Sequence, residues 1–142
     1  MGEIMDITQV SEVSIALLQM NAIFFVGNVV LLWMVFRGVT NANLYGANTF
    51  SKVIHSIMSL CIVAFNLNTY GNITSVVNNW AYALTESGEE LSGGLKLFAE
   101  NMNATSYSTG SLIPTDPLGI IFWSVVTVGL IGGMWSAPEP KE

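Results

Sequence analysis

The polar side chains that could carry chemistry lie inside long apolar stretches of this sequence. His55, Ser59 and Asn66 are spaced at i, i+4 and i+11, so they share one face of a helix. A neutral imidazole near a membrane surface could shuttle protons, bind a metal or hydrogen-bond a quinone headgroup. Proton chemistry also needs a partner base and an orienting acid, and the apolar stretches contain no Asp or Glu. A hydrogen-bonded structural role is therefore the favoured interpretation of His55.

A second polar stripe precedes the first one in the chain. Ser14, Asn21 and Asn28 are seven residues apart and lie on nearly one helical face. Such a stripe could line a pore or a ligand path. Amides in apolar helices more often form hydrogen bonds across a helix interface, so we interpret Asn21 and Asn28 as interhelical contacts.

The last apolar stretch contains small residues instead of amides. Gly129 and Gly133 form a GxxxG pattern, which lets two helix backbones approach closely. Gly119 and Ser124 add further small side chains to the same stretch. The pattern favours packing against another helix, in this chain or in a neighbour.

Other chemical motifs are weak or absent from the sequence. A single histidine and a single cysteine, Cys61, exclude an intrachain disulfide, a multi-histidine centre and a cysteine-rich zinc site. Four acidic residues lack the alternating spacing of a calcium loop and predict a solvated face: Glu86, Glu89, Glu90 and Glu100. No phosphate loop, dinucleotide turn or nucleophile elbow occurs. We expect no catalytic set, no bound metal and no cofactor.

Two short sequences match the N-glycosylation pattern. They begin at Asn72 and Asn103. The chain is rich in asparagine, so chance matches are expected, and the pattern has no meaning in a chain from a prokaryote.

The composition indicates that the solvent of this chain is a lipid bilayer. The 142 residues are 51% hydrophobic and 10% charged, whereas soluble domains carry about 25% charged residues. Four basic residues against ten acidic ones exclude a nucleic-acid partner, because that role needs clustered Lys and Arg. The length fits a single domain, residues 1–142.

The elements that position these residues are predicted to be three transmembrane helices. We place the spans at residues 13–36, 50–70 and 117–135, and Gly71 is a plausible break after the second. Asp116 and Pro117 are a typical helix start. Residues 71–116 contain the acidic cluster. Near their start, apolar residues from Ile73 to Leu84 follow helical spacing and predict an amphipathic helix, which either extends the second span beyond the membrane or lies along the interface. The predicted class is an all-α membrane protein with an exposed, partly helical segment between helices two and three.

The orientation follows from four basic residues. Arg37 and Lys52 flank the first loop, Lys141 follows the third span, and Lys96 lies alone among acids. The positive-inside rule then places the N-terminus and residues 71–116 outside, in the periplasm, lumen or extracellular space, and the C-terminus on the cytoplasmic side.

The favoured function is a noncatalytic accessory subunit of a larger integral membrane complex. Each predicted span has one adhesive face, and a lone three-helix bundle has little interior in which to bury all three faces. We therefore expect other integral membrane subunits as partners. The alternatives are a homo-oligomeric channel lined by Asn21 and Asn28 or by Ser59 and Asn66, a self-associating envelope protein and, last, an enzyme whose cofactor comes from a partner.

Overall fold

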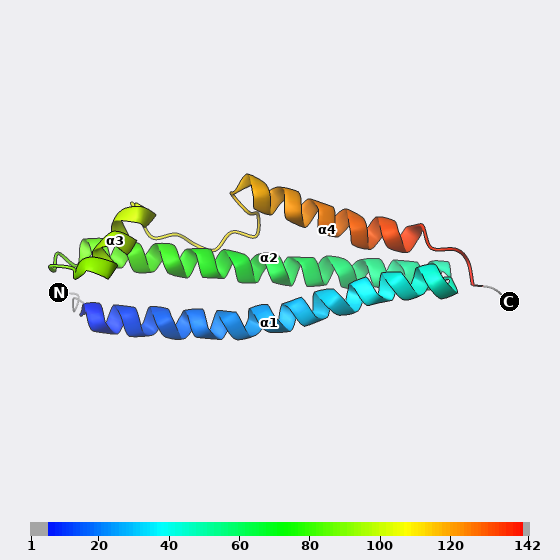
Figure 1. Cartoon of the computed structure of the whole chain (residues 1–142), viewed down its shortest axis with the longest axis horizontal. Helices are drawn as coiled ribbons and strands as arrows, with labels where there is room; N and C mark the ends of the chain where they lie inside the picture. The colour runs from blue at the N-terminus through cyan, green and yellow to red at the C-terminus, as the bar shows by residue number, and fades with distance from the viewer. Residues whose placement is uncertain (1–5, 141–142) are drawn as a thin grey trace.

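The computed structural model of the protein describes residues 6–140. The helices are α1 (Ile7–Tyr45), α2 (Thr49–Glu86), α3 (Gly93–Met102) and α4 (Pro117–Trp135), and the described residues contain no β-strand. In Figure 1, α1 and α2 run side by side as a long antiparallel hairpin, α4 lies along the half nearest their connecting turn, and α3 lies at the other end. The predicted all-helical class is confirmed. Residues 1–5, which include Glu3, and Lys141, on which the orientation partly depends, lie outside the described residues.

Polar caps define where the helices start. The Asp6 carboxylate accepts a hydrogen bond from the Thr8 amide at 3.3 Å, and Asn48 accepts one from the Ser51 amide at 2.9 Å. Asp116 accepts from the Gly119 amide, with Pro117 in the first turn of α4. These contacts satisfy amides that a helix start leaves without an intrahelical partner.

The first two helices extend well beyond the spans expected from hydropathy. Instead of 13–36 and 50–70, the helices cover Ile7–Tyr45 and Thr49–Glu86, whereas the third expected span, 117–135, coincides with α4. The first loop, expected between Arg37 and Lys52 because residues 38–51 are rich in Asn, Gly and Thr, is helical up to Tyr45 and again from Thr49. Gly46 ends α1 with a φ of 85°, a conformation that favours glycine. Packing explains the extension, because Ala42 is buried in a small core with Ala47, Met134 and Ala137.

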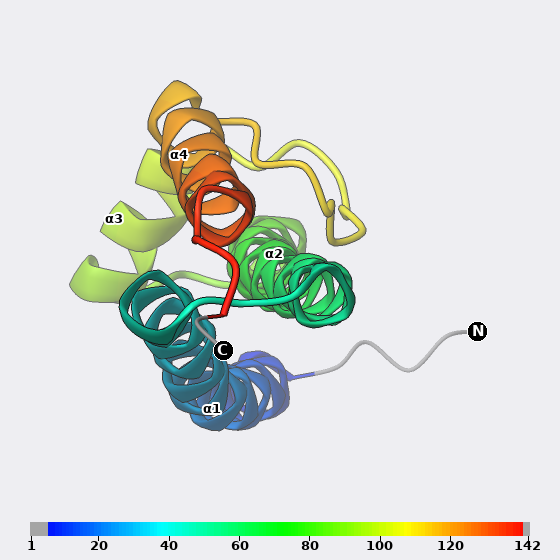
Figure 2. The ribbon, with the colours of Figure 1, turned by 90° about the vertical axis from the view of Figure 1, so that its right-hand side faces the viewer.

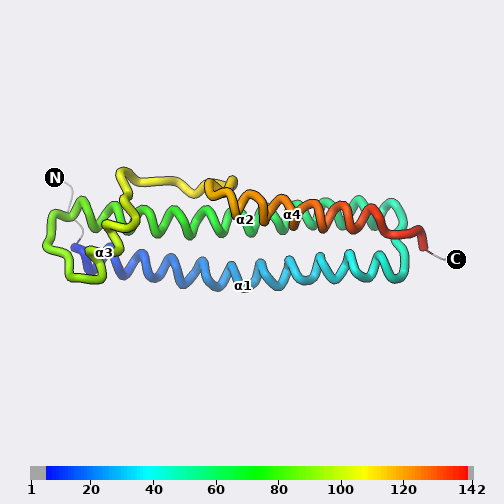
Figure 3. Tube along the Cα trace, turned by 45° about the horizontal axis from the view of Figure 1, so that its top comes forward, coloured from blue at the N-terminus to red at the C-terminus, as the bar shows by residue number. Residues whose placement is uncertain are grey.

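Helix α2 continues through Gly71, where we expected a break. Residues 71–86 therefore belong to the same helix as the second expected span. A side chain at position 71 would collide with the backbone of Ser111. Glycine is present at this position because an extended segment lies directly against the helix, and the segment's path along α2 is visible in Figure 3.

The apolar core lies where three helices meet near the connecting turn. Val35 of α1, Ile62 and Val63 of α2, and Val126 and Leu130 of α4 form this cluster. Viewed from the turn, the ends of the three helices form a triangle (Figure 2). Leu130 is fully buried there, so α4 is packed against both helices of the hairpin.

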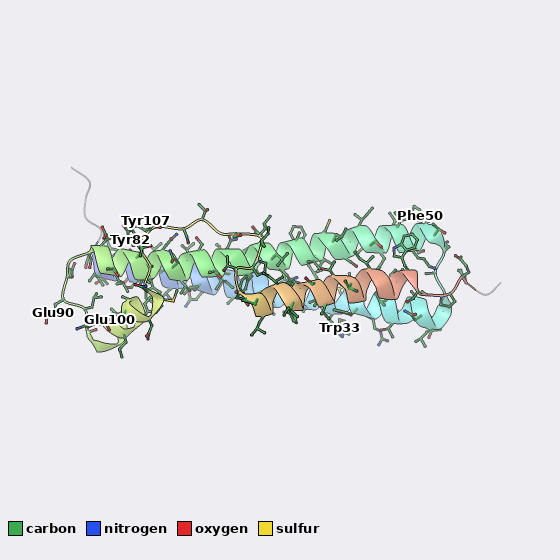
Figure 4. All side chains as sticks on the ribbon, turned by 90° about the horizontal axis from the view of Figure 1, so that it is seen from above. Trp33, Phe50, Tyr82, Glu90, Glu100 and Tyr107 are labelled. Atoms are coloured by element: carbon green, nitrogen blue, oxygen red, sulfur yellow. The ribbon has the colours of Figure 1, made fainter. Side chains whose placement is uncertain are left out.

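In the described part of the chain, three helices are long and apolar enough to cross a membrane, namely α1, α2 and α4. Large apolar side chains remain exposed along them, such as Ile23, Val26 and Trp33 of α1 at 75%, 64% and 64%. Figure 4 shows Trp33 in the middle of the molecule, with Glu90 and Glu100 together at one end and Phe50 at the other. The arrangement is compatible with an integral membrane location.

Candidate functional site: the seam and groove between α1 and α2

The buried face of α1 repeats every seven residues. Its buried residues are Ser14, Asn21, Asn28, Val35 and Ala42. This spacing is the one that keeps one stripe of a helix against a partner helix in a left-handed pair. We call the contact of this stripe with α2 the seam; it is polar in its first half and apolar in its second half.

Asn28 joins the two helices of the seam. Its amide nitrogen donates to the Thr69 hydroxyl at 2.8 Å and lies 3.4 Å from the Phe65 carbonyl oxygen. The Thr69 hydroxyl in turn donates to the Phe65 carbonyl at 3.0 Å. Asn28 is 9% exposed, so this interhelical hydrogen bond is shielded from water. The sequence reasoning expected such a contact for this residue.

Asn21 and Asn66 are buried at the seam but form hydrogen bonds within their own helices. Asn21 donates to the Leu17 carbonyl at 2.9 Å, and Asn66 donates to the Ile62 carbonyl at 2.9 Å. Both side chains are at most 6% exposed. These two side chains therefore pack at the interface between the helices without forming a hydrogen bond across it.

His55 and Ser59 carry the two buried side-chain atoms that have no hydrogen-bond partner in the described part of the chain. These atoms are Nε2 of His55 and Oγ of Ser59, and Ser59 is 1% exposed. The His55 ring lies against Gly38 of α1, where an added Cβ would be 2.5 Å from Cε1. The ring also interacts with the Val35 backbone carbonyl. Position 38 is a glycine because the His55 imidazole occupies the space that a larger side chain at this position would need.

The two glycines of the GxxxG pattern in α4, Gly129 and Gly133, have different neighbours. A Cβ at Gly133 would lie 2.8 Å from Cγ1 of Val39, whereas one at Gly129 would be 3.9 Å from Cε1 of Phe36. The close helix contact that the GxxxG pattern suggests is thus formed at Gly133, and it joins α4 to α1 of the same chain.

A polar cluster fixes the C-terminal end of α4 to the hairpin turn. The Lys52 ammonium donates to the Ala137 carbonyl at 2.7 Å and is 7% exposed. Asn43 donates to the Gly133 carbonyl at 3.0 Å, and the Trp135 indole donates to the Ser56 hydroxyl at 3.0 Å. From the sequence, Lys52 was expected to act only as an orientation charge, and this role was not predicted. A lysine within the first turn of an apolar helix was the available signal.

An open groove lies over the polar half of the seam. Its volume is about 570 Å³, and its lining comes from α1 and α2 alone, with Phe24 and Phe65 as walls and Asn21, Asn28 and Thr69 at the helix contact. A second hollow of about 420 Å³ continues it towards the N-terminus of α1, sharing Leu17 and Val76. Among the described residues, no Asp, Glu, Lys, Arg or His side chain lines the first groove.

An extended segment runs along α2 beside this groove, since Ser75 and Asn79, which line the groove and the second hollow, bond to Ser108 of the segment. The Ser108 amide donates to the Asn79 amide oxygen at 2.7 Å, and Asn79 and Ser75 donate back to the Ser108 carbonyl at 3.0 and 2.7 Å. Asn78 donates to the Ser106 carbonyl at 2.9 Å. The asparagines of α2 therefore satisfy the backbone of a segment that has no regular secondary structure.

The start of α4 is joined to α2 through Asp116. The Tyr70 hydroxyl donates to Oδ2 of Asp116 at 2.8 Å. The pKa of Asp116 is lowered, first by the hydrogen bond from the Gly119 amide and then by the one from Tyr70. Both donors stabilise the carboxylate form. This pair places the beginning of α4 at the level of Tyr70.

Helix α3 packs on the end of α2 that is far from the turn. The ring of Phe98 stacks near that of Trp80 with centroids 4.9 Å apart, and Ala99 is buried. Trp80 also donates to the Ser11 hydroxyl at 3.3 Å. Of the two glycosylation patterns, Asn72 lies within α2, whereas Asn103 is the exposed C-cap of α3 with a φ of 45°.

No protein-family model, curated protein or solved structure matches this chain. Within residues 6–140, no group of three or more His, Cys, Asp or Glu side chains is arranged to hold a metal ion.

Proposed function

We propose that this chain is a noncatalytic accessory subunit of a larger integral membrane complex. In this proposal α1, α2 and α4 cross the bilayer, and α4, with 19 residues, sets the depth of the apolar layer. Its length of about 28 Å matches a hydrocarbon core of about 30 Å. The turn with Lys52 faces the cytoplasm, and the exposed segment with α3 and the acidic cluster lies outside.

The observation that carries the proposal is the set of exposed apolar side chains near the N-terminal end of α1. Val13, Ile15 and Met20 are 53%, 45% and 49% exposed. The second hollow places Val13 and Ser14 at the level of Asn79, where α2 is covered by the extended segment 104–116. Because irregular backbone is not tolerated facing lipid, this level lies beyond the hydrocarbon core. Apolar side chains exposed there need protein to cover them.

The partner that fits this surface is an apolar helix of another membrane subunit. Such a helix would run alongside α1 and continue past the end of α4. Exposed apolar patches of this kind are typical of interaction sites. The subunit would then brace its partner at one side and present α3 and the acidic residues to the outer solution.

Purification from native membranes in mild detergent, followed by mass spectrometry, tests this role. We expect other membrane subunits to co-purify with the parent chain and to be lost with Val13→Asn combined with Ile15→Asn. The matched control is Leu97→Asn, which changes an apolar side chain of α3 that is 61% exposed. Purification of the parent chain without any other protein would contradict the accessory role.

The alternative is a homo-oligomeric channel lined by Asn21 and Asn28 or by Ser59 and Asn66. These four side chains are at most 9% exposed between α1 and α2, and Asn28 is bonded to Thr69. This burial favours the accessory role over a pore lining. A closed ring of one chain in native mass spectrometry would reverse the choice.

The orientation is tested separately with impermeant thiol reagents. The exposed Cys61 is first replaced by serine, and single cysteines are placed at Asn41 or Asn101, which are both exposed. We expect Asn101→Cys to react from outside and Asn41→Cys to react only after the membrane is opened. The opposite pattern would invert the topology.

A further inference from the structure

The groove over the polar half of the seam has unused hydrogen-bonding groups. Asn68 and Asn72 are exposed side chains on its α2 wall, and neither has a side-chain hydrogen bond among the described residues. The amide nitrogens of Asn21 and Asn28 are engaged, but their carbonyl oxygens accept no bond in the described part of the chain. The groove therefore offers both donors and acceptors to a ligand.

The chemistry of these groups selects an uncharged, hydroxyl-bearing ligand. Amides donate and accept hydrogen bonds without carrying charge. Within residues 6–140, no ionisable acid, base or histidine lines the groove, so a charged headgroup would lose water there without gaining a counter-ion. Hydroxyl groups match amides in both directions. The volume of about 570 Å³ lies in the range of about 300–1,000 Å³ that small-molecule sites occupy.

The position of the groove indicates that the ligand is amphiphilic. Tyr70 and Asp116 mark the level at which α4 begins. Phe65 lies more than one turn of α2 towards the connecting turn from this level, and Asn72 lies on the other side of it. The groove thus crosses the edge of the apolar layer. Phe65 lies within the layer, and Asn28 lies at the edge because it bonds to Thr69. Phe24, one turn of α1 further from the connecting turn, lies with Asn21 and Asn72 on the outer side.

We propose that this groove binds the sugar headgroup of an uncharged glycolipid, with the acyl chains passing Phe65 into the bilayer. This inference depends on the membrane placement of the proposed function but not on the identity of any partner subunit. Asn68 and Asn72 would hydrogen-bond the sugar directly, and the carbonyl oxygens of Asn21 and Asn28 would accept from its hydroxyls.

Native mass spectrometry of the full chain in a detergent without a sugar headgroup tests the proposal. The probes are monoglucosyl-dioleoylglycerol, dioleoylphosphatidylglycerol and dioleoylphosphatidylcholine, with octyl glucoside as a sugar without the diacylglycerol body. We expect the glucosyl lipid to bind at least tenfold more tightly than either phospholipid. Asn68→Leu combined with Asn72→Leu should weaken that binding about tenfold, because two neutral hydrogen bonds are lost.

The control variant is Asn101→Leu, which changes an exposed asparagine of α3 outside the groove. It should leave lipid binding unchanged. Equal binding of all three lipids, or full retention of the glucosyl lipid by the double variant, would overturn the proposal. Cross-linking of Asn68→Cys to another protein in native membranes would assign the groove to a partner helix and overturn it as well.

The outcomes separate this inference from the accessory role. A chain that co-purifies with other subunits but binds the three lipids equally would refute only the glycolipid site. A chain that purifies alone but selects the glucosyl lipid would refute only the accessory role.

Discussion

Replacing Gly71 by alanine tests how the extended segment 104–116 is held on α2. In the structure, a Cβ at this position would overlap the backbone of Ser111. Backbone has no alternative rotamer with which to avoid the methyl group, so the segment itself must move. We expect Gly71→Ala to leave α2 helical and to weaken the docking of the segment.

The magnitude follows from two opposing effects. Alanine favours a helix interior over glycine by about 1 kcal/mol, but this gain is the same whether the segment is docked or not. Overpacking typically costs about 1–3 kcal/mol, and this cost falls only on the docked state. The docking equilibrium should therefore shift about 5-fold to 150-fold, while the free energy of unfolding of the whole chain changes by less.

Hydrogen exchange measured by mass spectrometry on peptides from residues 104–115 is the assay. The Ser108 amide, which donates to Asn79 at 2.7 Å, should lose protection by the same factor in Gly71→Ala. The matched control is Gly27→Ala in α1, where a Cβ would meet nothing within 4 Å, and we expect no change there. Unchanged or slower exchange of this peptide in Gly71→Ala would refute the close approach of the segment.

Four further changes probe the seam and the ends of α4. Asn28→Leu removes the interhelical bond to α2 and should destabilise the chain by about 0.6–1.7 kcal/mol, measured by reversible unfolding in mixed micelles. Gly133→Ile should insert normally into the membrane but separate α4 from α1, and Gly129→Ile should separate them less. Cysteine cross-linking between α1 and α4 measures this separation in both variants. Lys52→Met removes a charge-assisted bond at the C-terminal end of α4 and should cost about 1.5–3 kcal/mol, seen as faster exchange over residues 131–140. The pKa of Asp116 is lowered in the fold, so its carboxylate stabilises the start of α4 at pH values above the unfolded pKa. This stabilisation is lost as the pH falls through the folded pKa. Asp116→Asn should remove the pH dependence of amide hydrogen exchange in the first turn of α4.

The polar spacing of α1 was the most informative feature of the sequence. A repeat of seven residues places Ser14, Asn21 and Asn28 on one face, and this face is buried in the structure. Periodicity identifies a buried face because amides facing lipid are costly. It does not identify which helix covers the face, since that depends on contacts between residues far apart in the chain, such as Asn28 and Thr69.

The ends of α1 and α2 were not predictable from hydropathy, because packing decides them. The sequence from Arg37 to Tyr45 has loop composition, yet it is helical and places Ala42 in a small core. Gly71 has the appearance of a helix break, yet α2 continues because the glycine makes room for another segment. Local propensities of about 1 kcal/mol per glycine are small against such tertiary contacts.

The reason to expect a partner changes once the structure is known. From the sequence alone, each adhesive helix face was a reason to expect other subunits as partners. In the fold, Asn28 bonds to α2 and Gly133 approaches α1, so these two faces are occupied by the chain's own helices and require no partner. A partner is now expected because of the exposed apolar side chains near the start of α1, such as Val13, Ile15 and Met20, which lie at a level where α2 is covered by hydrogen-bonded backbone. Lipid covers apolar helices but not irregular backbone, and water covers irregular backbone but not a row of apolar side chains. The proposed helix of another subunit along this end of α1 would resolve that conflict.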